Sequence, residues 1–164
     1  MIPTYLALAE RIRLDLDELE RTLDAVQRHW QRLRTAGHDQ DAYVNSVALN
    51  LHGFYSGLER LFEMTATQVD GSALGGESWH TELLQQMTLD IPEVRPPVLR
   101  EDTASRLDEY RKFRHRIRNI YATNLDPERI EPLVSALPDL WPSLRGEMLS
   151  FVAFLERIAR ADPS

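Results

Sequence analysis

The chain has 164 residues, of which 43% are apolar, and it carries a formal net charge of −7 and no cysteine. These values predict one domain with one buried core over residues 1–164, exclude disulfides and thiolate metal sites, and argue mildly against tight, nonspecific nucleic-acid binding. No apolar run approaches the roughly 20 residues of a membrane span, and no secretory signal is recognisable at the start, so we expect a cytoplasmic protein without a membrane segment.

Two long amphipathic helices are predicted in the first part of the chain. From about Thr4 to Arg34, apolar residues recur every three or four positions, which indicates one buried helical face. Gly37 favours a stop, and Asp39 or Asp41 can cap the next helix, which extends to about Gln68.

A polar stripe lies beside the apolar face of this second helix. Its members fall within roughly 100° of one another on a helix: His52, Tyr55, Ser56, Glu59 and Glu63. No Glu-x-x-His pair accompanies Glu59 and Glu63, as a di-iron bundle requires. We therefore expect both glutamates to pair with arginines, within the chain or across a dimer. The five histidines have no metal-ligand spacing, so no metal site is predicted.

A loop, a short helix and an extended segment are predicted next. The glycine-rich stretch 70–76 lacks the Lys-Ser/Thr ending of a P-loop and the strand that precedes one, so we interpret it as a plain loop. Ser78 is expected to cap a short helix over about Trp79–Leu89 that lies across the bundle. Three prolines within Ile91–Pro97 then favour extended chain.

Two further helices complete the predicted fold. One begins near Thr103 and ends around Asn124. The other starts at Asp126-Pro127, an N-cap followed by proline at the first helical position, and reaches about Ala161, with Pro138 and Pro142 breaking or kinking it. No alternating strand pattern is present. The fold class is therefore all-α, an up-and-down bundle of four main helices plus a short crossing helix.

The penultimate helix carries a local excess of basic residues. Five of the nineteen Lys and Arg residues fall between Arg111 and Arg118. On a helix, Arg111, Arg114 and Arg118 share one narrow sector, flanked by His115 and Asn119. This arrangement predicts a basic surface that binds phosphate. The alternative interpretation is a solvated face, or a set of ion pairs with an acidic neighbouring helix.

Two segments resemble a known family. The run R-H-x3-N-x-Y, at Arg114, His115, Asn119 and Tyr121, resembles the R-[N/D/H]-x(4–6)-H-x-Y signature of the HEPN superfamily, and particularly of its HepT-like ribonuclease toxins. The block from Asn50 to Glu63 resembles the second helix of these proteins. One position departs from the signature, because Asn119 stands where the family has a histidine.

The resemblance implies a single HEPN/HepT-like domain acting as a metal-independent endoribonuclease toxin of a toxin–antitoxin pair, without a cofactor. The proteins it resembles work as homodimers that cleave RNA in a cleft shared by two motif helices. Carried over, Arg114 would stabilise the charged phosphate, with Asn119 and His115 as the other catalytic residues.

The resemblance also implies roles for the remaining motif positions, in binding the substrate and in being modified by the partner. Arg111, Arg118 and Tyr121 are expected to contact RNA. In the pairs that this chain resembles, the antitoxin is a minimal nucleotidyltransferase that transfers AMP to the motif tyrosine, which makes Tyr121 a candidate modification site. A tyrosine at the border of the core is the structural alternative for this position.

The substitution at Asn119 leaves three hypotheses open. An amide cannot exchange a proton near neutral pH, and general acid–base catalysis typically contributes about 10²- to 10⁴-fold. A site with Arg114 and Asn119 alone would cleave RNA slowly, unless His115 transfers the proton from about 100° away on the helix. The second hypothesis is a catalytically weak or inactive module that binds a ligand in the same cleft. The third is a plain helical interaction subunit.

Overall fold

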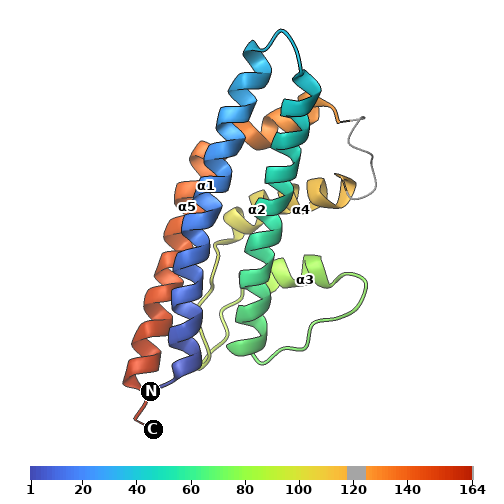
Figure 1. Cartoon of the computed structure of the whole chain (residues 1–164). Helices are drawn as coiled ribbons and strands as arrows, with labels where there is room; N and C mark the ends of the chain where they lie inside the picture. The colour runs from blue at the N-terminus through green and yellow to red at the C-terminus, as the bar shows by residue number, and fades with distance from the viewer. Residues whose placement is uncertain (118–124, 164) are drawn as a thin grey trace.

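The computed structural model describes residues 1–117 and 125–163, and this part of the chain contains helices and no strand. The helices are α1 (Pro3–Thr35), α2 (Gln40–Gln68), α3 (Trp79–Gln86), α4 (Glu101–Ile117) and α5 (Pro127–Ala161). The predicted all-α bundle, with four main helices and a short fifth, is confirmed (Figure 1). None of these described helices has the length and apolarity needed to cross a membrane.

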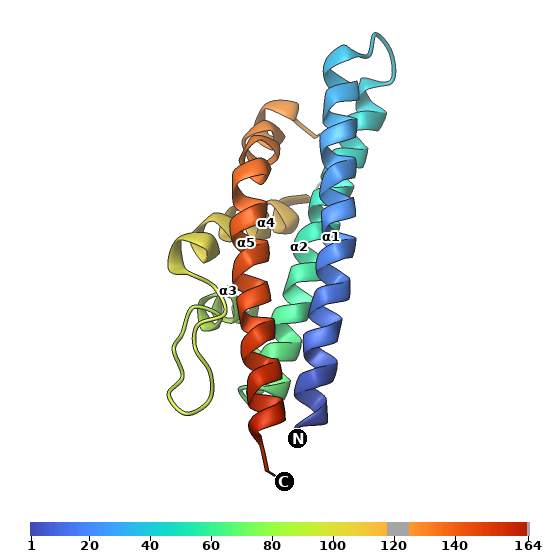
Figure 2. The same ribbon diagram turned by 90° about the vertical axis from the view of Figure 1, so that its left-hand side faces the viewer.

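Three long helices form the body of the bundle. α2 returns antiparallel to α1, and α5 descends beside α1 to end near the start of the chain (Figure 2). The backbone N–H of Ile2 donates to the carbonyl of Ala159 at 3.0 Å, which ties these two helix ends together. From Ala9 onward the buried residues of α1 recur every three or four positions, as its apolar pattern predicts, and Leu8 is buried beside them: Leu8, Ala9, Ile12, Leu16, Leu19, Leu23, Val26, Trp30 and Leu33.

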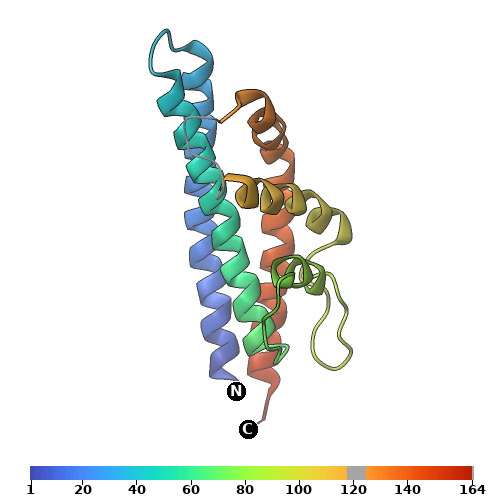
Figure 3. The ribbon, with the colours of Figure 1, turned by 90° about the vertical axis from the view of Figure 1, so that its right-hand side faces the viewer.

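α4 is the main difference from an up-and-down bundle. It lies across the long helices, packed on α2 and α5, with α3 beside it (Figure 3). Two contacts of Tyr110 hold it there: its ring meets that of Phe54 edge-on at 5.7 Å, and its hydroxyl donates a hydrogen bond to the carbonyl of Leu133 at 2.7 Å. The extended segment before α4 allows this crossing, because it frees α4 from continuing the direction of α3.

Of the capping residues predicted at the helix starts, only some make the expected hydrogen bond. Asp126 caps α5, since its Oδ1 accepts the backbone N–H of Glu128 at 3.0 Å. Of the two candidates for the start of α2, Asp39 holds the N-cap position, but it does so in a left-handed conformation (φ 61°) and its side chain makes no cap hydrogen bond. Ser78 also makes none to the backbone, because its hydroxyl donates to the carboxylate of Glu82.

α4 begins at Glu101, two residues before the predicted start. The carboxylate of Glu147 on α5 explains the shift, because it accepts the backbone N–H of Arg100 at 2.6 Å and the hydroxyl of Thr103 at 2.7 Å. It therefore satisfies donors at the helix start. The expected end near Asn124 lies outside the described residues. α3 ends at Gln86, three residues earlier than predicted.

α5 is one continuous helix through Pro132, Pro138 and Pro142. Its first part passes behind α1 and α2, below the loop that joins them, before the remainder turns to follow α1 (Figure 1). The prolines therefore kink this helix without breaking it, as expected where a ring replaces a backbone donor.

Candidate functional site

The motif arginine lies in the interior of the fold. Arg114 is 6% exposed, and its partner on α2, Glu59, is 4% exposed. Arg114 Nη1 lies 2.9 Å from Glu59 Oε1, and Nη2 donates to Oε2 at 3.0 Å. This two-point contact matches the planar fork of a guanidinium to a carboxylate. The expected arginine–glutamate pair therefore forms within the chain for Glu59, whereas Glu63 forms no ion pair with a described residue.

The expected basic surface does not include Arg114, because this residue is buried. Tyr110 precedes Arg114 by four residues and is buried, and Ile117 follows it by three and is half-buried. Residues three and four apart share a helix face, so Arg114 faces α2. His115 is the next residue and lies on the exposed side of α4.

Arg111 lies outside this interior pair. It donates to Asp108 on its own helix at 2.6 Å. Burial acts to raise the pKa of Asp108, but the hydrogen bond and charge of Arg111 outweigh it and hold that pKa below its usual value. Of the other predicted site residues, Arg118, Asn119 and Tyr121 lie outside the described residues.

An imidazole completes the cluster and was not predicted. His80, at the start of α3, places Nδ1 2.9 Å from Glu59 Oε2 and 3.2 Å from Arg114 Nη2. Its ring packs on that of Trp79 at 3.7 Å between centroids. His80 is 34 residues from Arg114 in sequence, and no spacing rule indicates which side chains a short crossing helix brings to α2 and α4.

Other residues of the polar stripe on α2 surround the guanidinium. Ser56 accepts a long hydrogen bond of 3.4 Å from Arg114 Nη1. The ring of Tyr55 lies 4.9 Å from the guanidinium carbon, in a cation–π contact. Burial raises the pKa of Tyr55, and its hydroxyl has no hydrogen-bond partner among the described residues. The same holds for Nε of Arg114. The predicted polar stripe on α2 therefore supplies the side chains that contact the motif arginine.

A second buried ion pair fixes the helix that carries His80. Arg95 is 2% exposed, and its Nε and Nη2 donate to Asp70 at 2.6 and 2.7 Å. The same guanidinium donates to the carbonyls of Gln86 and Leu89, at 3.0 and 2.9 Å. Because these carbonyls belong to the end of α3 and the turn after it, Arg95 holds α3 against the loop that follows α2.

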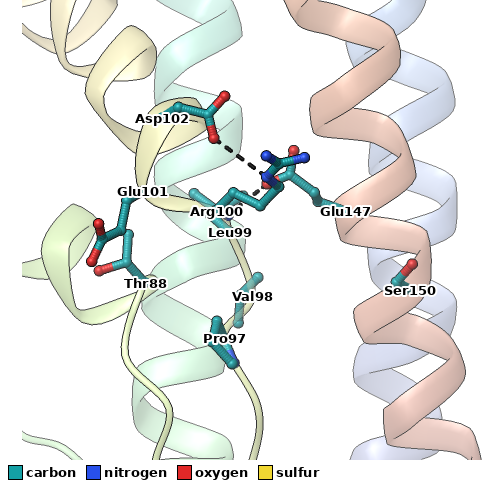
Figure 4. Close-up of a pocket in the computed structure, with 9 residues that line it drawn as sticks. All are labelled: Thr88, Pro97, Val98, Leu99, Arg100, Glu101, Asp102, Glu147 and Ser150. Carbon is teal, nitrogen blue, oxygen red and sulfur yellow. Dashed lines mark hydrogen bonds and ion pairs between the residues drawn. The ribbon is translucent and has the colours of Figure 1, made fainter.

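A hollow of about 700 Å³ lies elsewhere, between the start of α4 and α5 (Figure 4). Arg100 and Glu147 face it from opposite walls. It contains none of the predicted site residues, and the carboxylate of Glu147 already occupies the start of α4. Among the residues that the structure describes, no group of three or more His, Asp or Glu is placed to hold a metal ion.

One comparison with known proteins finds a family that covers the region of the cluster. The model of one protein family, described as HepT-like protein, matches residues 46–155. This range includes Glu59, His80 and Arg114, and thus the whole interior cluster. A search of the curated proteins and a search of the solved structures each find no match.

Proposed function

Because the chain belongs to the family of HepT-like proteins, we propose that it is an RNA-cleaving toxin of a toxin–antitoxin pair that works without a metal. The observation that carries this proposal is the interior cluster of Arg114, Glu59 and His80. It places the motif arginine, a carboxylate and an imidazole within hydrogen-bonding distance of one another. These are side chains that can stabilise charge and transfer protons.

The chemistry of RNA cleavage sets three requirements. The ribose 2′-hydroxyl loses a proton, the leaving 5′-oxygen gains one, and the charge on the phosphorus centre is stabilised. We assign the third task to Arg114, which stays charged at any working pH. Because both of its terminal nitrogens contact Glu59, a phosphoryl oxygen has to draw one of them away from that carboxylate.

The wider arrangement follows the family. We propose a homodimer whose motif helices meet, with Arg111, Arg118 and Tyr121 along the RNA and Asn119 orienting it through its amide. The antitoxin would be a minimal nucleotidyltransferase that modifies Tyr121. His115, on the exposed side of α4, is then a residue that contacts substrate at the margin of the site.

A second candidate function has its own supporting observation. Arg114 is 6% exposed and both of its terminal nitrogens are bound by Glu59, which is the arrangement of a structural ion pair. Together with Asn119 in the histidine position, this favours a weak or inactive module that binds RNA or a partner protein without turnover.

An assay of the cleavage of a mixed RNA by the purified protein in EDTA distinguishes the ribonuclease from the binding module. The variants are Arg114→Lys and the double variant Arg114→Met/Glu59→Leu, which leaves no charge buried without a partner. Arg106→Gln is the matched control, because Arg106 is on the same helix but pairs with Asp139, a largely exposed side chain. Each protein is first compared by circular dichroism and by oligomeric state.

For the ribonuclease, we expect wild-type cleavage that leaves cyclic-phosphate ends. The double variant should lose at least about 10²-fold, as for removal of an oxyanion-stabilising donor, and Arg106→Gln should keep its rate. Binding of RNA by wild type without any turnover would instead support the second function. Wild-type cleavage that the double variant retains in full would remove Arg114 from the site.

A further inference from the structure

The cluster contains an imidazole although the motif lacks its histidine. Nδ1 of His80 and Nη2 of Arg114 both approach Oε2 of Glu59, at 2.9 and 3.0 Å. The two nitrogens lie 3.2 Å apart. Two donors therefore converge on a single carboxylate oxygen, and the imidazole is in contact with both members of the buried ion pair.

The position of the ring proton follows from this contact. Glu59 receives both terminal nitrogens of a guanidinium that is always charged, so its oxygens act as hydrogen-bond acceptors. The 2.9 Å contact with His80 then requires the proton on Nδ1. In the neutral ring, Nε2 carries a free lone pair and can accept a proton.

The opposite edge of the ring is available. No described residue forms a hydrogen bond with Nε2, and the side chain of His80 is 30% exposed while that of Glu59 is 6% exposed. The ring of Trp79, which packs against the imidazole at a tilt of 31°, and the attachment of α3 by Arg95 limit the movement of the imidazole. A fixed imidazole with one nitrogen on a buried carboxylate and the other open is the arrangement of a general base oriented by a carboxylate.

We propose that His80 is the proton-transfer residue of this site, with Glu59 fixing its tautomer, in place of the motif histidine that Asn119 replaces. This inference rests on the proposed RNA cleavage. Nε2 of His80 takes the proton of the ribose 2′-hydroxyl while the 2′-oxygen attacks phosphorus. The bond from phosphorus to the 5′-oxygen breaks, and the imidazolium returns the proton to that oxygen. The products are a 2′,3′-cyclic phosphate and a 5′-hydroxyl, and the protein is unchanged.

The geometry favours His80 over His115 for this role. His115 follows Arg114 directly and lies on the exposed side of α4, whereas Arg114 points into the interior. His80 comes from another helix and reaches the same guanidinium. A sequence motif that covers only α4 therefore cannot identify His80.

The test is the RNA cleavage assay in EDTA with His80→Gln and His80→Ala in the full chain. The amide of His80→Gln can still donate to Glu59 Oε2, so this variant is expected to keep the fold. His29→Gln is the matched control, because His29 is a partly buried histidine on α1 that contacts Ser46. Circular dichroism and thermal unfolding are recorded for every protein.

We expect His80→Gln to lower kcat by about 10²- to 10⁴-fold with little change in KM, while His29→Gln keeps wild-type values. Added imidazole should restore part of the rate to His80→Ala, because a free base can occupy the space left by the ring. A structural role for His80 predicts no such rescue.

The outcomes separate the two proposals. Wild-type cleavage that His80→Gln retains, or a lost activity that imidazole does not restore to a folded His80→Ala, overturns the role of His80 and leaves the ribonuclease intact. No cleavage by the wild type overturns the ribonuclease itself, and the role of His80 with it.

Discussion

The buried pair of Arg114 and Glu59 makes a sharp prediction about stability. Their side chains are 7% and 6% exposed, so the pair belongs to the interior class rather than to surface salt bridges, which contribute about 0–1 kcal/mol. Arg114→Met leaves the Glu59 carboxylate buried without a counter-charge, which typically costs about 3–5 kcal/mol. A domain has only about 5–15 kcal/mol of stability in total. We therefore expect Arg114→Met to lower Tm by about 2–4 °C for each kcal/mol lost.

The double variant Arg114→Met/Glu59→Leu should recover most of this loss. It removes both charges, and well-packed apolar pairs often match a buried ion pair in stability. His80 is partly exposed, so its Nδ1 can turn to water when Glu59 is absent. Urea unfolding followed by circular dichroism at 222 nm measures the cycle. We expect the double variant to be at least about 2 kcal/mol more stable than Arg114→Met; equal losses would refute the interpretation that an unpaired buried charge is the main cost.

Three further predictions concern other parts of the fold. At Gly57 an added Cβ would lie 2.9 Å from Cδ2 of Leu19, whereas at Gly53, on the same helix, nothing lies within 4 Å; we expect Gly57→Ala to be at least about 1 kcal/mol less stable than Gly53→Ala, and equal urea midpoints would contradict this. Asp126→Ala should cost about 1 kcal/mol through loss of the N-cap of α5, while the asparagine variant stays near wild type in the same measurement. Burial, reinforced by a neighbouring carboxylate, raises the pKa of Glu63, so the folded state binds its proton more tightly and stability falls as pH rises through the unfolded and then the folded pKa. Glu63→Gln should therefore raise Tm at pH 7 but not at pH 4, and a gain that is independent of pH would show that charge is not the cause.

The helices were predictable because burial imposes a period on the sequence. The apolar pattern at the start of the chain predicted a helix from about Thr4 to Arg34, and in the structure α1 spans Pro3–Thr35. The crossing of α4 was not predictable in this way. A helical period defines which residues share a face, but the direction in which a helix lies across its neighbours depends on contacts such as those of Tyr110 with α2 and α5.

The candidate site was predictable in composition and only partly in arrangement. The polar stripe on α2 predicted ion pairs of Glu59 and Glu63 with arginines, and the structure has one of them, between Glu59 and Arg114. The burial of Arg114 had a signal that the charge pattern obscured: Tyr110 and Ile117 flank it on one helix face. His80 had no local signal, because the contact joins residues 21 positions apart on one side and 34 on the other.

The attachment of α3 has a consequence for local opening of the fold. A helix of eight residues is too short to persist on its own in water. α3 is held by His80 on Glu59 at one end and by Arg95 at the other, with Leu83 and Leu84 buried between. We expect such a segment to open as one cooperative unit and to exchange its amide hydrogens before the long helices do. Its opening would carry the imidazole away from Glu59 and admit water to the guanidinium while α1, α2 and α5 stay folded.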